Sequence, residues 1–234
     1  MRSTLLLAFG FVSVVTSASA AECNRSAYAS VGTAYPIQEA GYLATEKPVL
    51  QSGVTLSCGP WSYDLWTSYE LSNRSPYGAR GEGDEWDLTI GYADEIQTAA
   101  GPIAFELSGS YWALTSLGRM ADDIVELYAD VGRPFTIGGI TIGPFFRVTE
   151  WVGLGAFPSS TFVRPGVRIE IPLSSRLTAR GDVSRSFDLS DRLAVTHGEA
   201  ALEYALTDTW SVSVSVQATE GIRTVGFLGI SKSF

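Results

Sequence analysis

The strongest constraint in this sequence is an alternation of apolar and polar residues with a period of two. Residues 210–217, Trp-Ser-Val-Ser-Val-Ser-Val-Gln, alternate without a fault, and similar patterns run through 85–92, 103–111 and 162–171. Successive side chains of a β-strand point to opposite faces, so each segment predicts a strand with one apolar and one polar face. No helical stripe follows Ala20. The expected fold class is therefore all-β.

The alternation divides the chain into twelve expected strands, and ten is the alternative because the first, tenth and twelfth are weak. The expected strands are residues 26–35, 49–58, 61–71, 85–96, 103–114, 124–134, 140–152, 162–173, 177–188, 193–206, 209–219 and 222–234. Short connections (59–60, 97–102, 135–139, 174–176, 207–208) contrast with longer ones (35–48, 72–84, 115–123, 153–161). This arrangement is typical of an antiparallel up-and-down transmembrane β-barrel of the bacterial outer membrane.

The first twenty residues have the features of an export signal. Arg2 precedes an apolar run over residues 5–15, and Ala18-Ser19-Ala20 offers the small residues that a signal peptidase accepts. The run is too short to span a bilayer as a helix. We therefore expect residues 1–20 to be a cleaved signal peptide, residues 21–234 to be the barrel, and the mature protein to reside in the outer membrane.

Composition excludes one class of function and leaves one alternative fold open. The 234 residues include 25 acidic and 16 basic side chains, with a net charge of −9, which disfavours a nucleic-acid binder. A secreted β-sandwich or lipocalin-like barrel would also alternate. Tryptophans at expected strand ends favour the membrane barrel, because aromatic girdles mark the two bilayer interfaces. They are Trp61 and Trp210 at the turn side and Trp86, Trp112 and Trp151 at the loop side, whereas Trp66 lies mid-strand on the polar face.

The chain ends on an aromatic residue. Phe234 shares its face with Ile230 and Leu228, although Lys232 interrupts the apolar pattern. A terminal aromatic with alternating apolar positions is similar to the signal by which the insertion machinery recognises outer-membrane proteins. We therefore expect that machinery and outer-membrane lipid to be partners, together with small solutes.

Three segments resemble a known family. They are Pro48-Val49-Leu50-Gln51-Ser52-Gly53-Val54, Gly59-Pro60-Trp61-Ser62-Tyr63-Asp64-Leu65-Trp66 and Asp84-Glu85-Trp86-Asp87-Leu88-Thr89-Ile90-Gly91-Tyr92-Ala93. With the later run over residues 122–128, they resemble the TorF-like porin family over about residues 26–135. The resemblance implies a pore and carries no catalytic residue.

The polar faces of the expected strands carry charges of opposite sign on different strands. The acidic set is Asp64, Glu70, Asp87, Glu106, Glu126 and Asp130, and the basic set is Arg147, Arg164, Arg168 and Arg180, with Glu170 and Asp182 among them. An acidic wall facing an arginine-rich wall predicts a porin or narrow diffusion channel for small polar or charged solutes. The alternative is a closed structural barrel filled by these side chains. We expect no cofactor and no metal.

An outer-membrane acyl hydrolase is the remaining alternative, and it would depend on His197, the one histidine. The position two residues on holds Glu199 where such an enzyme would want a serine, so we expect a lumenal histidine and no enzyme.

The two cysteines, Cys23 and Cys58, lie in the exported part, where a disulfide is favoured over free thiols. They are expected at neighbouring strands on the periplasmic side.

Overall fold

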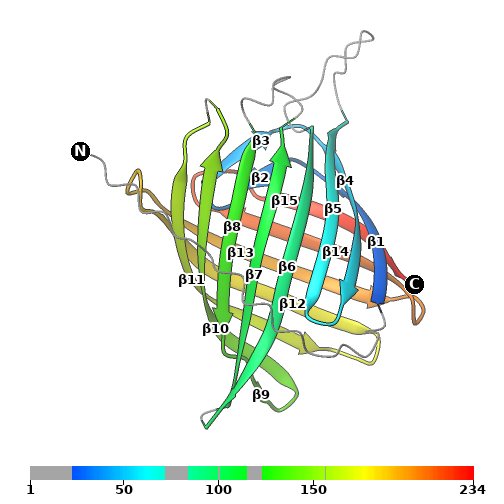
Figure 1. Ribbon diagram of the computed structural model, residues 1–234. Helices are drawn as coiled ribbons and strands as arrows, with labels where there is room; N and C mark the ends of the chain where they lie inside the picture. Colours follow the sequence, from blue (N-terminus) through cyan, green and yellow to red (C-terminus); the bar gives the residue numbers. More distant parts are fainter. Residues whose placement is uncertain (1–22, 72–83, 100, 115–122, 156) are drawn as a thin grey trace.

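The computed structural model describes residues 23–71, 84–99, 101–114, 123–155 and 157–234, and it is a closed antiparallel barrel (Figure 1). Its twelve long strands are β1 (Cys23–Gly32), β4 (Val49–Cys58), β5 (Trp61–Glu70), β6 (Glu85–Thr98), β7 (Gly101–Ala113), β8 (Ile124–Gly132), β10 (Ile140–Gly153), β11 (Ser160–Pro172), β12 (Leu177–Asp188), β13 (Ala194–Ala205), β14 (Trp210–Thr219) and β15 (Val225–Ser233). Each pairs with its neighbours in chain order, and β1 closes the barrel on β15. The expected twelve strands are confirmed, and the alternative of ten is wrong.

Three short strands were not predicted. β2 (Tyr35–Ile37) and β3 (Tyr42–Thr45) form a separate hairpin inside the first long connection. β9 (Phe135–Ile137) pairs with the start of β10 and extends a turn at the opposite end of the barrel (Figure 1). In the described ranges, no helix is long and apolar enough to cross a membrane. The expected signal peptide lies outside the described residues.

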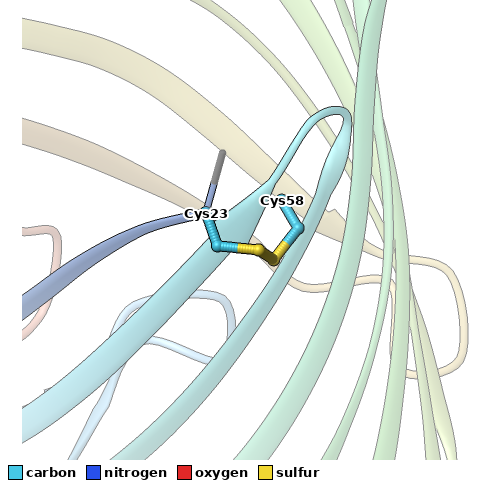
Figure 2. The surroundings of a disulfide bond; sticks show 2 residues. All are labelled: Cys23 and Cys58. Carbon is cyan, nitrogen blue, oxygen red and sulfur yellow. A yellow bond between two sulfur atoms is a disulfide. The ribbon is translucent and has the colours of Figure 1, made fainter. Parts of the chain in front are cut away.

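The two ends of the barrel differ in their connections. We call the end that carries residues 59–60, 173–176 and 206–209 the turn end, and the end that carries residues 33–48, 189–193 and 220–224 the loop end. At the turn end Cys23 on β1 faces Cys58 on β4 as a register partner, and the two form a disulfide with Cα atoms 4.3 Å apart (Figure 2). This is the placement that the sequence predicted.

Strand alternation gives the barrel an apolar outer face. Large apolar side chains such as Val54, Leu88 and Val214 lie exposed on it, while the intervening residues point inward. At its C-terminal end Leu228, Ile230 and Phe234 also lie exposed on this face. An outer face made of apolar side chains suits the lipid bilayer, because hydrocarbon chains offer no hydrogen-bond partners. The insertion role of the last strand stays a prediction.

The tryptophans divide between the two faces. Trp61, Trp86 and Trp210 are exposed, whereas Trp112 and Trp151 point into the barrel and pack edge-to-face with ring centroids 5.3 Å apart. The expectation that Trp112 and Trp151 belong to an outer girdle is therefore wrong. The reason is that side-chain direction in a strand follows parity, and both tryptophans occupy inward positions near the ends of their strands.

Candidate functional site

The first long connection folds into the barrel at the loop end. Its β2–β3 hairpin buries Ile37 against an apolar cluster of Ile124, Trp151 and Phe162, which come from β8, β10 and β11. Thr45 of the same hairpin is also buried. An apolar core inside a barrel excludes water locally, so the hairpin constricts the lumen at this end.

Tyr35 connects the hairpin to the opposite wall. Its hydroxyl donates a hydrogen bond to Glu85 Oε2 on β6 at 2.8 Å, and its ring packs on Trp66 of β5 with centroids 5.6 Å apart. Burial and the nearby Glu85 carboxylate raise the pKa of Tyr35 well above its usual value, so the hydroxyl remains a donor. Trp66, which did not fit the girdle pattern, therefore supports the hairpin from inside.

Ion pairs hold the hairpin on two sides. Arg164 of β11 reaches Glu39 at 3.1 Å and Asp182 at 3.4 Å, and its Nε donates to Ser184 Oγ at 2.7 Å. On the other side Lys47 pairs with Glu70 of β5 at 2.8 Å. The side chain of Arg164 is only 8% exposed, so this contact is shielded from solvent. The hairpin is thus fixed to β5, β6 and β11.

The turn end of the lumen is hollow. A cavity of about 790 Å³ is lined by residues of the long strands from β6 to β15. Its polar lining residues include Glu106, Asp130, Arg168, Glu170, Arg180, Asp182, Glu199, Glu203, Ser211, Ser213, Ser215 and Ser231. A second hollow of about 250 Å³ shares three of the serines and extends along β1, where Tyr28 and Ser30 line it. The lumen can therefore hold small hydrated solutes at this end.

The four arginines predicted from the sequence all point inward and are paired with carboxylates. Asp130 binds Arg147 at 2.9 Å and Arg168 at 2.7 Å. Arg180 bridges Glu170 at 2.9 Å and Glu203 at 2.6 Å, and Arg164 is paired as described above. The strand register explains this, since Arg147 lies opposite Asp130, and Arg180 opposite Glu170. The arginines that we expected to face an acidic wall are thus paired with carboxylates of β8, β11, β12, β13 and the hairpin.

Three of the four remaining predicted acids accept hydrogen bonds from neutral donors. Asp64 accepts a hydrogen bond from Thr55 at 2.5 Å, and Glu126 accepts one from Trp151 Nε1 at 2.8 Å. Glu106 accepts one from the Tyr128 hydroxyl. Asp87 points inward between Trp66 and Trp112 in the register of β5, β6 and β7. In the described part of the chain, none of these four acids forms an ion pair with an arginine or a lysine.

His197, on which the hydrolase alternative depends, is buried on the inward face of β13. Its Nδ1 lies 3.3 Å from Thr219 Oγ1. Its register partner on β12 is Ser184, whose hydroxyl accepts the hydrogen bond from Arg164. Neither side chain lies at the lipid-facing surface, where an acyl chain would arrive.

Several lumenal residues were missed in the sequence. Glu39 and Lys47 lie in an expected loop, so nothing local placed them inside the barrel. Glu85, in contrast, shares the inward parity of Asp87, and parity alone could have found it.

No protein-family model and no curated protein matches this chain in sequence. In structure it is similar to a solved chain described as the KdgM porin, with a TM-score of 0.61 and 8% identity over 90% of this chain and 99% of that one. The NanC porin gives a TM-score of 0.55 and 9% identity, with 90% and 98% covered. An outer membrane channel, COG4313 from Pseudomonas putida F1, gives 0.53 and 11%, with 92% and 96% covered. At these identities the likeness shows the fold, which is that of outer-membrane porins and channels.

Proposed function

We propose that this protein is a bacterial outer-membrane porin, a narrow diffusion channel for small polar or charged solutes. The observation that carries the proposal is the 790 Å³ lumenal cavity, which is lined by charged groups and serines of the strands from β6 to β15 and lies inside a closed twelve-stranded barrel. A polar lumen inside an apolar outer face is the arrangement that conducts hydrated solutes through a bilayer. The shared fold with the KdgM and NanC porins supports it.

The proposal includes the topology and the partners. Residues 1–20 would direct export, and residues 21–234 would form the barrel with its turn end in the periplasm. The insertion machinery would recognise the last strand through Leu228, Ile230 and Phe234, which lie on the lipid-facing surface. We assign it no enzymatic step, because His197, on which an acyl hydrolase would depend, is buried inside the barrel and away from the lipid-facing surface.

The β2–β3 hairpin would set the size limit of this channel. It fills the loop end of the lumen through Ile37, Tyr35 and Glu39, so a solute has to pass beside it. The pore-lining roles assigned to the predicted acids and arginines follow from their inward positions. One similar structure is described as the KdgM porin in complex with disordered oligogalacturonate. Because the arginines here are paired with carboxylates, we expect this lumen to favour neutral and cationic solutes over such an acidic oligosaccharide.

A closed structural barrel is the second candidate, and the apolar cluster around Ile37 is the observation that favours it. Liposome swelling distinguishes the two. Vesicles that contain the purified barrel should swell in small sugars and amino acids and fail to swell in large oligosaccharides. Vesicles that do not swell in any solute, although they contain folded barrel, would support the closed structure.

A further inference from the structure

Three buried oxygen atoms lie together on the inward face of β5 and β6, next to the hairpin. They are Ser68 Oγ, Glu85 Oε1 and Asp87 Oδ1, and none has a hydrogen-bond partner among the described residues. Ser68 and Glu85 are register partners on neighbouring strands, and Asp87 is the next inward residue of β6. Such partners have Cβ atoms about 5 Å apart, which lets their side chains converge. The arrangement brings two carboxylates and a hydroxyl to one place.

The site is shielded from solvent. Ser68 is 2% exposed and Glu85 is 5% exposed. Tyr35 covers Glu85 from the hairpin and occupies its other oxygen, Oε2, at 2.8 Å. Trp66 and Trp112 flank Asp87 in the register. Oxygens so placed cannot be solvated freely, and burying them without a partner costs free energy.

The charges around the site are all of one sign. The groups that act electrostatically on Asp87 are Glu85, Glu126 and Asp64, all carboxylates. Among the described residues, the arginine and lysine ion pairs involve other acids: Glu39, Glu70, Asp130, Glu170, Asp182 and Glu203. Two adjacent buried carboxylates repel each other unless a proton or a cation neutralises them.

We propose that Ser68, Glu85 and Asp87 form a binding site for one hard divalent cation, Ca²⁺ or Mg²⁺, which anchors the hairpin side of the lumen. Carboxylate and hydroxyl oxygens are the ligands of such ions, and two carboxylates match the charge of a divalent ion. Mg²⁺ in particular is commonly held by one or two carboxylates with water completing its shell. The described residues contain no cluster of three or more acidic, histidine or cysteine ligands, so the site would rest on two carboxylates, one hydroxyl and water. The bound ion would hold β5 and β6 together beneath Tyr35.

The competing explanation is a single proton shared by Glu85 and Asp87, which would make each carboxyl group the hydrogen-bond partner of the other. The test compares the thermal unfolding of the purified barrel, in detergent, with CaCl₂, MgCl₂, NaCl or EDTA at constant ionic strength. A ligand at 100 times its Kd raises the folded-to-unfolded ratio about 100-fold. We expect a saturable rise in the unfolding temperature with a divalent ion, lost in Glu85→Gln and Asp87→Asn and weakened in Ser68→Ala.

Glu170→Gln is the matched control, because Glu170 is an exposed lumenal acid that pairs with Arg180. It should keep the full response to divalent ions. Equal responses in the wild type and the two carboxylate variants would overturn the site, as would no response or a response to Na⁺ alone. If Glu85→Gln does not fold, Asp87→Asn decides the same question. The readout does not need conduction, so it is independent of the proposed channel function.

Discussion

Arg164 and Glu39, which lie 125 residues apart in the sequence, meet inside the barrel at 3.1 Å. The contact joins β11 to the hairpin of the first connection, and Asp182 shares the same guanidinium at 3.4 Å. Together with Lys47–Glu70 and Tyr35–Glu85, it holds the hairpin in the lumen at the loop end.

Glu39→Gln should loosen the hairpin and increase channel conductance. The substitution removes the hairpin's carboxylate but leaves Arg164 paired with Asp182, so the loss of stability should stay below the roughly 3–5 kcal/mol of a buried ion pair that loses one partner. Single-channel recording and urea unfolding check the two effects. Asp208→Asn, in an exposed turn between β13 and β14, is the control. An unchanged conductance in Glu39→Gln would mean that the pair does not restrict the path.

Asp130→Asn should shift ion preference toward anions. Asp130 neutralises both Arg147 and Arg168, so its loss leaves two lumenal arginines without this partner. Removing one member of a partly exposed pair should also cost roughly 1–3 kcal/mol, below the value for a fully buried pair. The reversal potential in a KCl gradient measures the shift. A potential equal to that of the wild type would contradict the assignment of these residues to the conducting path.

Reduction of Cys23–Cys58 should destabilise the barrel at the junction of β1 and β4. The two cysteines are 35 residues apart, and in the chain-entropy account a loop of this length corresponds to about 4 kcal/mol. Urea unfolding with and without reductant, and gel mobility of the unfolded chain, report on the bond. A Cys23→Ser, Cys58→Ser double variant should match the reduced protein. Equal mobility in both states with two alkylatable thiols would show that the bond does not form.

Strand positions could be predicted from the sequence because alternation is a local property. The expected strand 49–58 coincides with β4, and 61–71 differs from β5 by one residue. The inward direction of the predicted charges followed from the same parity. For Trp112, parity predicts the side-chain direction better than its position at a strand end does. Trp112 shares its inward face with Ser108 and Ser110.

The β2–β3 hairpin could not be predicted in this way. Its position inside the barrel depends on contacts of Ile37, Tyr35 and Glu39 with β8, β10, β6 and β11, which are distant in the sequence. The pairing of the arginines was missed for a related reason. Parity reports which face a residue occupies, whereas register decides which residue lies opposite, and only the assembled barrel fixes the register of β8, β10 and β11.

Single-channel recording of the purified, folded wild-type barrel in planar bilayers tests the central claim most directly. We predict discrete conductance steps that are small for a porin, because the hairpin narrows the loop end, with a preference for cations over chloride. Bilayers that contain inserted, folded barrel and show no conductance steps at any voltage would contradict the channel function.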